Sequence, residues 1–145
     1  GQVRINFPDV ARETFSQDNF TAAIDWQNGV YLSACALFRG DVKAKEVEEN
    51  MAAIRKTLNF ASYVPTGVKL GVADTAPEGF ASSGLALVNH TGIAAVFERL
   101  IANFDIMFDN HAYTHWYENA GVSRDMMATA RNTIANLAKS YRDAS

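Results

Sequence analysis

The sequence predicts a mixed α/β (α+β) fold, in which helices pack against a mixed sheet of about four strands and a helical hairpin ends the chain. Two observations lead to this prediction. Short apolar runs, such as 30–38 and 84–88, have the length of strands. The longer segment 93–108 carries apolar residues at steps of three and four, which is the period of one helix face. Helices and strands in this alternation favour helices layered on a sheet.

The bulk composition indicates one globular domain. The chain has 145 residues, and we expect residues 1–90 to hold the sheet with two helices and residues 91–145 to hold the C-terminal helices. The net charge of −3 leaves no basic cluster to neutralise phosphates, so no nucleic-acid partner is predicted. No apolar run reaches the roughly 20 residues that span a bilayer, so no membrane partner is predicted either.

The first elements follow from local signals. Pro8 suits the first turn of a short helix that ends near Ser16, because its fixed φ and missing N–H are compatible with that position. The run 30–38 is apolar almost throughout and is predicted as a strand buried on both faces. Cys35, the single cysteine, lies inside this run and is expected to be a small buried hydrophobe.

The next segment reads as a helix followed by three strands. Asp41 is a candidate N-cap for a helix over 42–57, whose apolar residues recur at helical spacing. Strands are predicted over 60–64 and 68–73, and the buried run 84–88 is predicted to lead into the long helix.

The stretch 89–117 is predicted to organise the remainder of the chain. Thr91 precedes the first apolar residue and is the expected cap of the long helix. Ser123 is the expected cap of a last helix that reaches Tyr141. Between the two helices lies a dense cluster of polar-tipped aromatic residues, of the kind often found where a core meets a surface or a partner.

Signals for chemistry are weak. His111 and His115 are four residues apart, which on a helix is the spacing of two metal ligands, with Asp109 and Glu118 as the nearest candidates for a third. Aromatic packing and hydrogen bonding are the simpler interpretation, and a zinc-dependent enzyme is the weakest hypothesis. The chain contains neither a glycine-rich phosphate loop nor a GxSxG motif. We therefore predict no catalytic residue, no cofactor and no metal in this chain.

Four motifs carry a resemblance to a known family. The run 28–42, NGVYLSACALFRGDV, resembles the tubulin pattern in which a buried strand ends in a hydrophobic-Arg-Gly turn. The segment 60–69, FASYVPTGVK, is similar to the tubulin strand pair around Pro-Thr-Gly-Phe-Lys. The residues NHT at 89–91, followed by FER at 97–99, resemble the strand-to-helix junction of tubulins, and AYTHWY at 112–117 is similar to their Ala-Phe-hydrophobic-His-Trp-Tyr signature. The motifs occur in family order over essentially the whole chain.

The resemblance implies the C-terminal part of a tubulin, comprising the later intermediate domain and the final helices. It implies that the GTPase domain lies upstream, so that GTP binds only to the full-length protein and this chain alone is not an enzyme. Other tubulin subunits are the implied partners, with microtubule-associated or centriolar proteins as further candidates. The implied location is the cytoplasm and its cytoskeleton, with the centriole or basal body as a more specific candidate.

Two sets of site residues carry over from the resemblance. The first matches regions that form the longitudinal contact between tubulin subunits: Pro65, Thr66, Gly67, Lys69, His115, Trp116 and Tyr117. The second set gives the last helix a mildly basic outer face on which partners would dock: Arg124, Arg131, Lys139 and Arg142. Simple solubility is the other interpretation of this second set. A stand-alone protein-interaction module that retains the tubulin C-terminal fold is the alternative function.

Several positions depart from the family pattern. Tyr63 stands where the strand pair has tryptophan, and the residues 118–122 replace the usual continuation after His-Trp-Tyr. The acidic run that follows in common tubulins is replaced by SRDMM at 123–127, and no acidic tail is present. These departures favour a divergent tubulin, such as a delta, epsilon, zeta or lineage-specific form.

Overall fold

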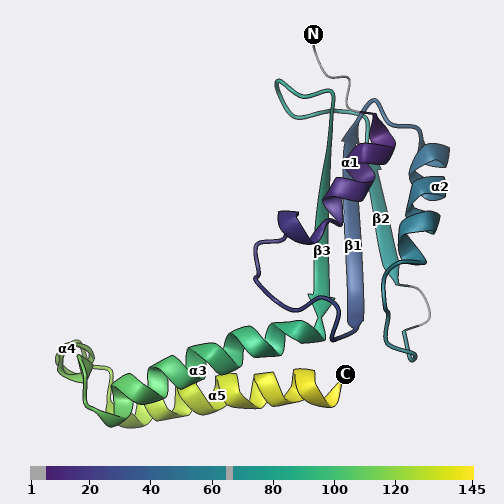
Figure 1. Ribbon diagram of the computed structural model, residues 1–145. Coiled ribbons are helices and arrows are strands. Elements are labelled where there is room, and N and C mark those ends of the chain that lie inside the picture. Colours follow the sequence, from purple (N-terminus) through teal and green to yellow (C-terminus); the bar gives the residue numbers. More distant parts are fainter. Residues whose placement is uncertain (1–5, 65–66) are drawn as a thin grey trace. The chain divides into compact units, whose positions relative to one another are not determined.

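The computed structural model describes residues 6–64 and 67–145, and the chain forms two compact units. The first unit holds the residues up to Thr21 together with Trp26–His90, and the second holds Ala22–Asp25 together with Thr91–Ser145. Figure 1 labels the elements of both units, and each unit is described by itself below. None of the helices in the described part of the chain is long and apolar enough to cross a bilayer.

The first unit is built on a mixed sheet of three strands. The central strand β1 (Tyr31–Gly40) pairs in parallel with β2 (Val68–Ala73) and antiparallel with β3 (Ser82–His90). These strands confirm the predicted α+β fold and three of the four predicted strands.

The fourth predicted strand, after Asn59, is wrong. Phe60 forms a single bridge with Tyr31, in which Tyr31 N donates to Asn59 O at 2.8 Å and Ala61 N donates to Tyr31 O at 3.0 Å. The chain then turns, with Val64 N donating to Ala61 O at 2.9 Å. The ladder between this segment and β1 therefore ends after one bridge.

Helix α1 (Phe7–Thr14) opens the described chain, and its start confirms the prediction from Pro8. Pro8 occupies the first turn, where a backbone N–H is not needed. Asn6 is the N-cap, and its side-chain oxygen accepts a hydrogen bond from Asp9 N at 3.1 Å. This bond satisfies one of the donors that a helix start leaves without an internal partner. A one-turn 3-10 helix, η1 (Gln17–Asn19), follows α1.

Helix α2 (Ala44–Arg55) connects β1 to β2 and confirms the helix predicted over 42–57. Its N-cap is Lys43, which makes no side-chain capping bond, so the predicted cap by Asp41 is wrong. The chain turns sharply after β1, with Val42 N donating to Gly40 O at 2.8 Å. Because of this turn, the helix begins after Asp41, at Ala44.

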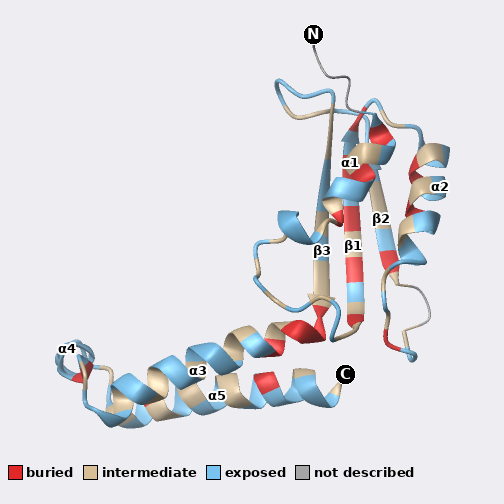
Figure 2. Cartoon of the chain, viewed as in Figure 1, coloured by how far each residue is buried: buried red, intermediate tan, exposed pale blue. Residues whose placement is uncertain are grey.

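The core lies between one face of the sheet and the two helices. Along β1, Ala34, Ala36 and Phe38 are buried, whereas the side chains between them are half-buried or exposed, as the alternating colours of β1 in Figure 2 show. Phe7 meets Phe38 edge to face, with the ring centroids 5.0 Å apart. The buried members of this core are Phe7, Ala11, Phe15, Ala34, Ala36, Phe38, Val47, Met51 and Val68.

The prediction that the strands are buried on both faces is therefore wrong. Leu37 of β1 and Leu85 and Leu87 of β3 are all exposed. An apolar run does not reveal whether a second layer of structure covers its other face, and α1 and α2 pack on the same face.

Two glycines permit close approaches that a side chain would block. Gly40 has a φ of 116°, a conformation that favours glycine, and a Cβ there would overlap the carbonyl oxygen of Ala81. At Gly84, a Cβ would overlap the hydroxyl of Thr14. The first glycine lets the loop between β2 and β3 pass the end of β1, and the second lets α1 pack against β3.

The second unit is helical. A 3-10 turn η2 (Thr91–Ile93) leads into α3 (Ala94–Asp109), and a short helix α4 (Thr114–Asn119) precedes α5 (Arg124–Asp143). Helices α3 and α5 run antiparallel and side by side, which confirms the predicted hairpin (Figure 1).

The two predicted caps in this unit have different outcomes. Ser123 caps α5 as predicted, because its hydroxyl accepts from Met126 N at 3.2 Å. Thr91 does not cap α3, since it is buried in η2 and Ile93 occupies the N-cap position.

We predict that Phe38→Ala lowers the free energy of unfolding by about 3–5 kcal/mol, because it removes a fully buried ring and leaves a cavity. The matched variant Leu37→Ala, on the open face of the same strand, should cost roughly 1 kcal/mol or less. Urea unfolding followed by Trp26 fluorescence in a Trp116→Phe background measures both values. Equal losses would mean that both faces of β1 contribute equally to stability.

Candidate interaction surfaces

The open face of the sheet is apolar. Leu37 is paired in register with Leu85, and Cys35 with Leu87, so the exposed leucines lie side by side across β1 and β3. Leu37 is 42% exposed, and Leu87 is 62% exposed. Contiguous apolar patches of this kind commonly mark sites where a protein contacts another surface.

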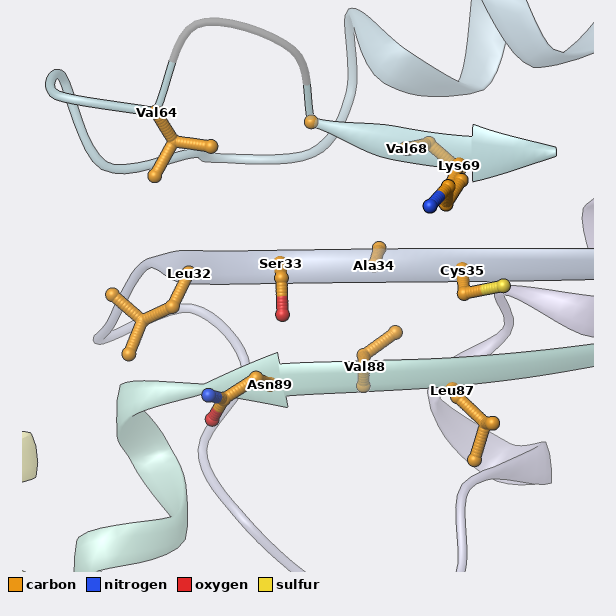
Figure 3. Close-up of a pocket in the computed structure, with 11 residues that line it drawn as sticks. Leu32, Ser33, Ala34, Cys35, Val64, Val68, Lys69, Leu87, Val88 and Asn89 are labelled. Atoms are coloured by element: carbon orange, nitrogen blue, oxygen red, sulfur yellow. The ribbon is translucent and has the colours of Figure 1, made fainter.

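A hollow of about 600 Å³ lies at one end of the sheet (Figure 3). Cys35 lines this hollow and is half-buried, so the expectation of a fully buried cysteine is wrong. Gly67 and Lys69, two of the predicted contact residues, also line it, and the Lys69 side chain is exposed. The predicted contact residues Pro65 and Thr66 lie outside the described residues.

The turn between α3 and α4 contains two residues with a left-handed backbone. His111 has a φ of 54° and Tyr113 a φ of 60°, and α4 begins only at the buried Thr114. His111 and His115 therefore do not share a helix face, and the spacing argument for a metal site is wrong. Among the described residues, no group of three His, Cys, Asp or Glu side chains is arranged to hold a metal ion.

Helix α4 presents aromatic side chains outward. Trp116 is 65% exposed and Tyr117 is 58% exposed, and the His115 ring lies against Trp116 with the centroids 4.8 Å apart. An apolar hollow of about 560 Å³ adjoins these side chains. Its remaining lining comes mainly from α3 and α5, through Phe104, Met107, Phe108 and Met127. The three predicted contact residues of this unit thus lie together on one short, exposed helix.

The basic residues of α5 are largely used within the hairpin. Arg131 donates two hydrogen bonds to the Asp105 carboxylate, at 2.9 and 2.6 Å, and Arg142 donates two to Glu98, at 2.8 and 2.6 Å. Paired bonds of this form fix the geometry of the two groups as well as attracting them. The rings of Phe97 and Tyr141 also face each other across the hairpin, with their centroids 6.2 Å apart.

Arg124, near the start of α5, is held differently. Its guanidinium lies 4.0 Å from the centroid of the Phe108 ring and donates to Phe108 O at 3.3 Å and to His111 Nδ1 at 3.0 Å. Of the four predicted docking cations, Lys139 alone forms no ion pair or hydrogen bond among the described residues. Most of the positive charge on α5 is therefore directed towards its own unit.

The ion pairs shift the pKa values of both partners. The hydrogen bonds from Arg131 hold the pKa of Asp105 below its ordinary value, and those from Arg142 do the same to the pKa of Glu98. In return, the carboxylates raise the pKa values of the two arginines. Both carboxyls thus favour the charged form in the folded hairpin.

The sequence did not identify Asp105 and Glu98 as partners of α5. They fall between the apolar positions of the long helix, and their arginine partners are 26 and 44 residues away. The sequence does contain one signal for these ion pairs, because the two helices expected to form an antiparallel hairpin carry opposite charges. Pairing the charges correctly requires the register between the two helices, and the spacing of residues within one helix does not give that register.

Both units thus expose apolar and aromatic side chains on ordered elements, and this arrangement defines a class of domain suited to packing against other protein surfaces. The comparisons with known proteins identify the family. The family model of the tubulin C-terminal domain matches residues 3–102. The chain belongs to the tubulin family.

Individual relatives agree with this assignment. The chain is 32% identical over 150 residues to the tubulin alpha-1 chain of Arabidopsis thaliana, covering 97% of this chain and 33% of that protein. It is 33% identical over 145 residues to the tubulin alpha chain of Pneumocystis carinii, covering 93% of this chain and 32% of that one. It is 36% identical over 131 residues to the tubulin beta chain of Porphyra purpurea, covering 89% and 29%. The chain therefore spans about a third of the length of these relatives, and the predicted delta, epsilon, zeta or lineage-specific class stays a prediction.

We predict that Asp105→Asn lowers the melting temperature of the chain by more at pH 7 than at pH 2. The folded pKa of Asp105 is depressed, so its stabilising effect is present above the unfolded value of about 3.9 and is lost as the pH falls through the folded value. Thermal melts followed by circular dichroism at both pH values measure this difference.

The matched control is Glu49→Gln, which removes an exposed ion pair with Lys45 within a single helix. This variant should melt at nearly the wild-type temperature at pH 7. A drop for Asp105→Asn that is equally large at both pH values would show that the amide disturbs packing rather than an ion pair.

Proposed function

We propose that this chain is a subunit-interface and partner-docking region of a cytoskeletal protein of the tubulin family, with a structural rather than a catalytic role. The observation that carries the proposal is the exposure of Trp116 and Tyr117, side by side on α4. Membership of the family supports it, because the relatives are alpha and beta tubulin chains. Other tubulin subunits are the proposed partners.

The energetics favour α4 as the centre of a contact. Tryptophan and tyrosine are enriched among interface residues whose truncation costs most, because they bury large areas and lose little side-chain entropy. Trp116 and Tyr117 sit beside an apolar hollow, so a partner side chain can bury itself there while it covers both rings. The left-handed turn and the buried Thr114 tie α4 to its unit, which limits the entropy lost on binding.

The sheet carries a second proposed contact. Gly67 lies against the ring of Phe60, and Lys69 presents its ammonium group beside the hollow of the first unit. Pro65 and Thr66 are included in this contact by resemblance alone. This internal packing needs glycine at position 67, because a side chain there would overlap the ring of Phe60.

The outer face of α5 is the proposed docking surface for further partners, such as microtubule-associated or centriolar proteins. Charge contributes little to it in our proposal, because Arg131 and Arg142 are paired with carboxylates and Arg124 is held by Phe108 and His111. Lys139 is the cation available to a partner. The proposed location is the cytoplasmic cytoskeleton, with the centriole or basal body as the more specific possibility.

We predict that Trp116→Ala weakens binding of the chain to αβ-tubulin about 10-fold or more, because it removes a proposed interface anchor. The melting temperature should change by no more than about 2 °C, since the side chain is mostly exposed. Sedimentation velocity with purified αβ-tubulin measures binding, and circular dichroism measures stability.

The chain offers a matched control in Phe80, an aromatic residue of the first unit that is 69% exposed. Phe80→Ala should leave binding unchanged. If Trp116→Ala reduces stability and binding together, Trp116 is a packing residue. If the wild-type chain does not bind αβ-tubulin, the proposed subunit contact is rejected. The alternative function, a stand-alone protein-interaction module, then takes its place.

We propose that GTP binding belongs to the full-length protein and not to this chain, in which no glycine-rich phosphate loop occurs. Titration of the chain with a fluorescent GTP analogue is expected to give no saturable signal. Saturable binding that unlabelled GTP competes away would contradict this proposal and place a nucleotide site within these residues.

A further inference from the structure

The turn before α4 is joined to α5 through a contact between a cation and a titratable ring. Arg124 Nη1 lies 3.0 Å from His111 Nδ1. A guanidinium only donates hydrogen bonds, so Nδ1 must be the acceptor, and the imidazole must be neutral with its proton on Nε2. The contact as formed is therefore specific to one protonation state of His111.

Arg124 has little freedom to withdraw. Its guanidinium is also held 4.0 Å from the Phe108 ring centroid and donates to Phe108 O at 3.3 Å. Protonation of His111 would replace the acceptor with a donor and place a second positive charge next to the guanidinium. At such a distance the two positive charges repel each other.

We expect protonation of His111 to displace the turn before α4 rather than helix α5. His111 and Tyr113 both have left-handed backbones, which cost free energy for residues other than glycine and persist only while neighbouring contacts hold them. His111 is exposed, so outward movement of its ring buries no charge. The next element along the chain is α4, which carries Trp116.

The charged and titratable groups around the turn come from three helices. They are Asp109 at the end of α3, His115 and Glu118 on α4, and Arg124 and Asp125 at the start of α5. Among the described residues, Arg124 is the member of this set that contacts the His111 ring. The pair His111–Arg124 is therefore the contact that protonation changes directly.

We propose that His111 and Arg124 form an acid-sensitive latch, which holds the turn before α4 when His111 is neutral and releases it when His111 is protonated. Release changes how α4 presents Trp116 and Tyr117. The consequence for assembly rests on the proposed function of α4, whereas the latch itself does not. Subunit contacts made through α4 weaken when acid protonates His111.

The test follows Trp116 fluorescence from pH 8 to pH 5 in the full chain. The background carries Trp26→Phe, which leaves Trp116 as the single tryptophan, and His115→Gln, which removes the imidazole stacked on Trp116. In this background we expect one sigmoidal shift of the emission maximum. Adding His111→Gln abolishes the shift, because the titrating group is gone. Adding Arg124→Gln abolishes it too, because the neutral amide does not repel charged His111 and its oxygen can accept a hydrogen bond from the ring.

A background protein without a shift overturns the latch, as does a shift that survives either added variant. Helical circular dichroism over the same range must stay constant, since its loss would mean that acid unfolds the hairpin instead. The measurement uses no partner, so its failure leaves the proposed tubulin contact standing. Conversely, a Trp116→Ala variant that binds αβ-tubulin normally overturns the contact and leaves the latch standing.

Discussion

The packing of the first unit depends on the alternation of side chains along β1. Successive residues of a strand point to opposite faces, so helices on one side leave every second side chain to the other. Ala34, Ala36 and Phe38 form the floor on which α1 and α2 pack. The small alanines bring the helices close, and Phe38 fills the space beside Phe7. Because helices α1 and α2 cover only one face of β1, Leu37 on the other face stays exposed.

The second unit relies on a different balance. The buried residues of α3 and α5 are few and mostly small, such as Ala94 and Ala138, so the hairpin has a thin apolar seam. Two bidentate arginine–carboxylate pairs define the register along this seam. The same pairs draw positive charge away from the surroundings. Helix α5 is basic in composition, but it therefore offers a partner much less positive charge than its composition indicates.

The sequence predicted the elements well where the signal is local. The spacing of apolar residues located α2, α3 and α5, and Ser123 was recognised as a cap because its bond spans only three residues. It failed where distant contacts decide. The strand expected near Phe60 became a turn, and the capping expected from Asp41 and Thr91 did not form because the backbone turns before each helix. Family motifs identified His115, Trp116 and Tyr117 as site residues, but no spacing rule could show that His111 lies outside their helix.

Gly40 shows how a residue can matter without taking part in any contact with a partner. Its backbone conformation and the nearby carbonyl of Ala81 leave no room for a side chain. In a mutational scan scored by growth or by assembly, substitutions at position 40 would be tolerated as poorly as those at a true interface residue. The cause would be different, because these substitutions would misplace the loop that precedes β3. Mutational scans of this chain can therefore be interpreted only when each position is also scored for soluble, folded yield.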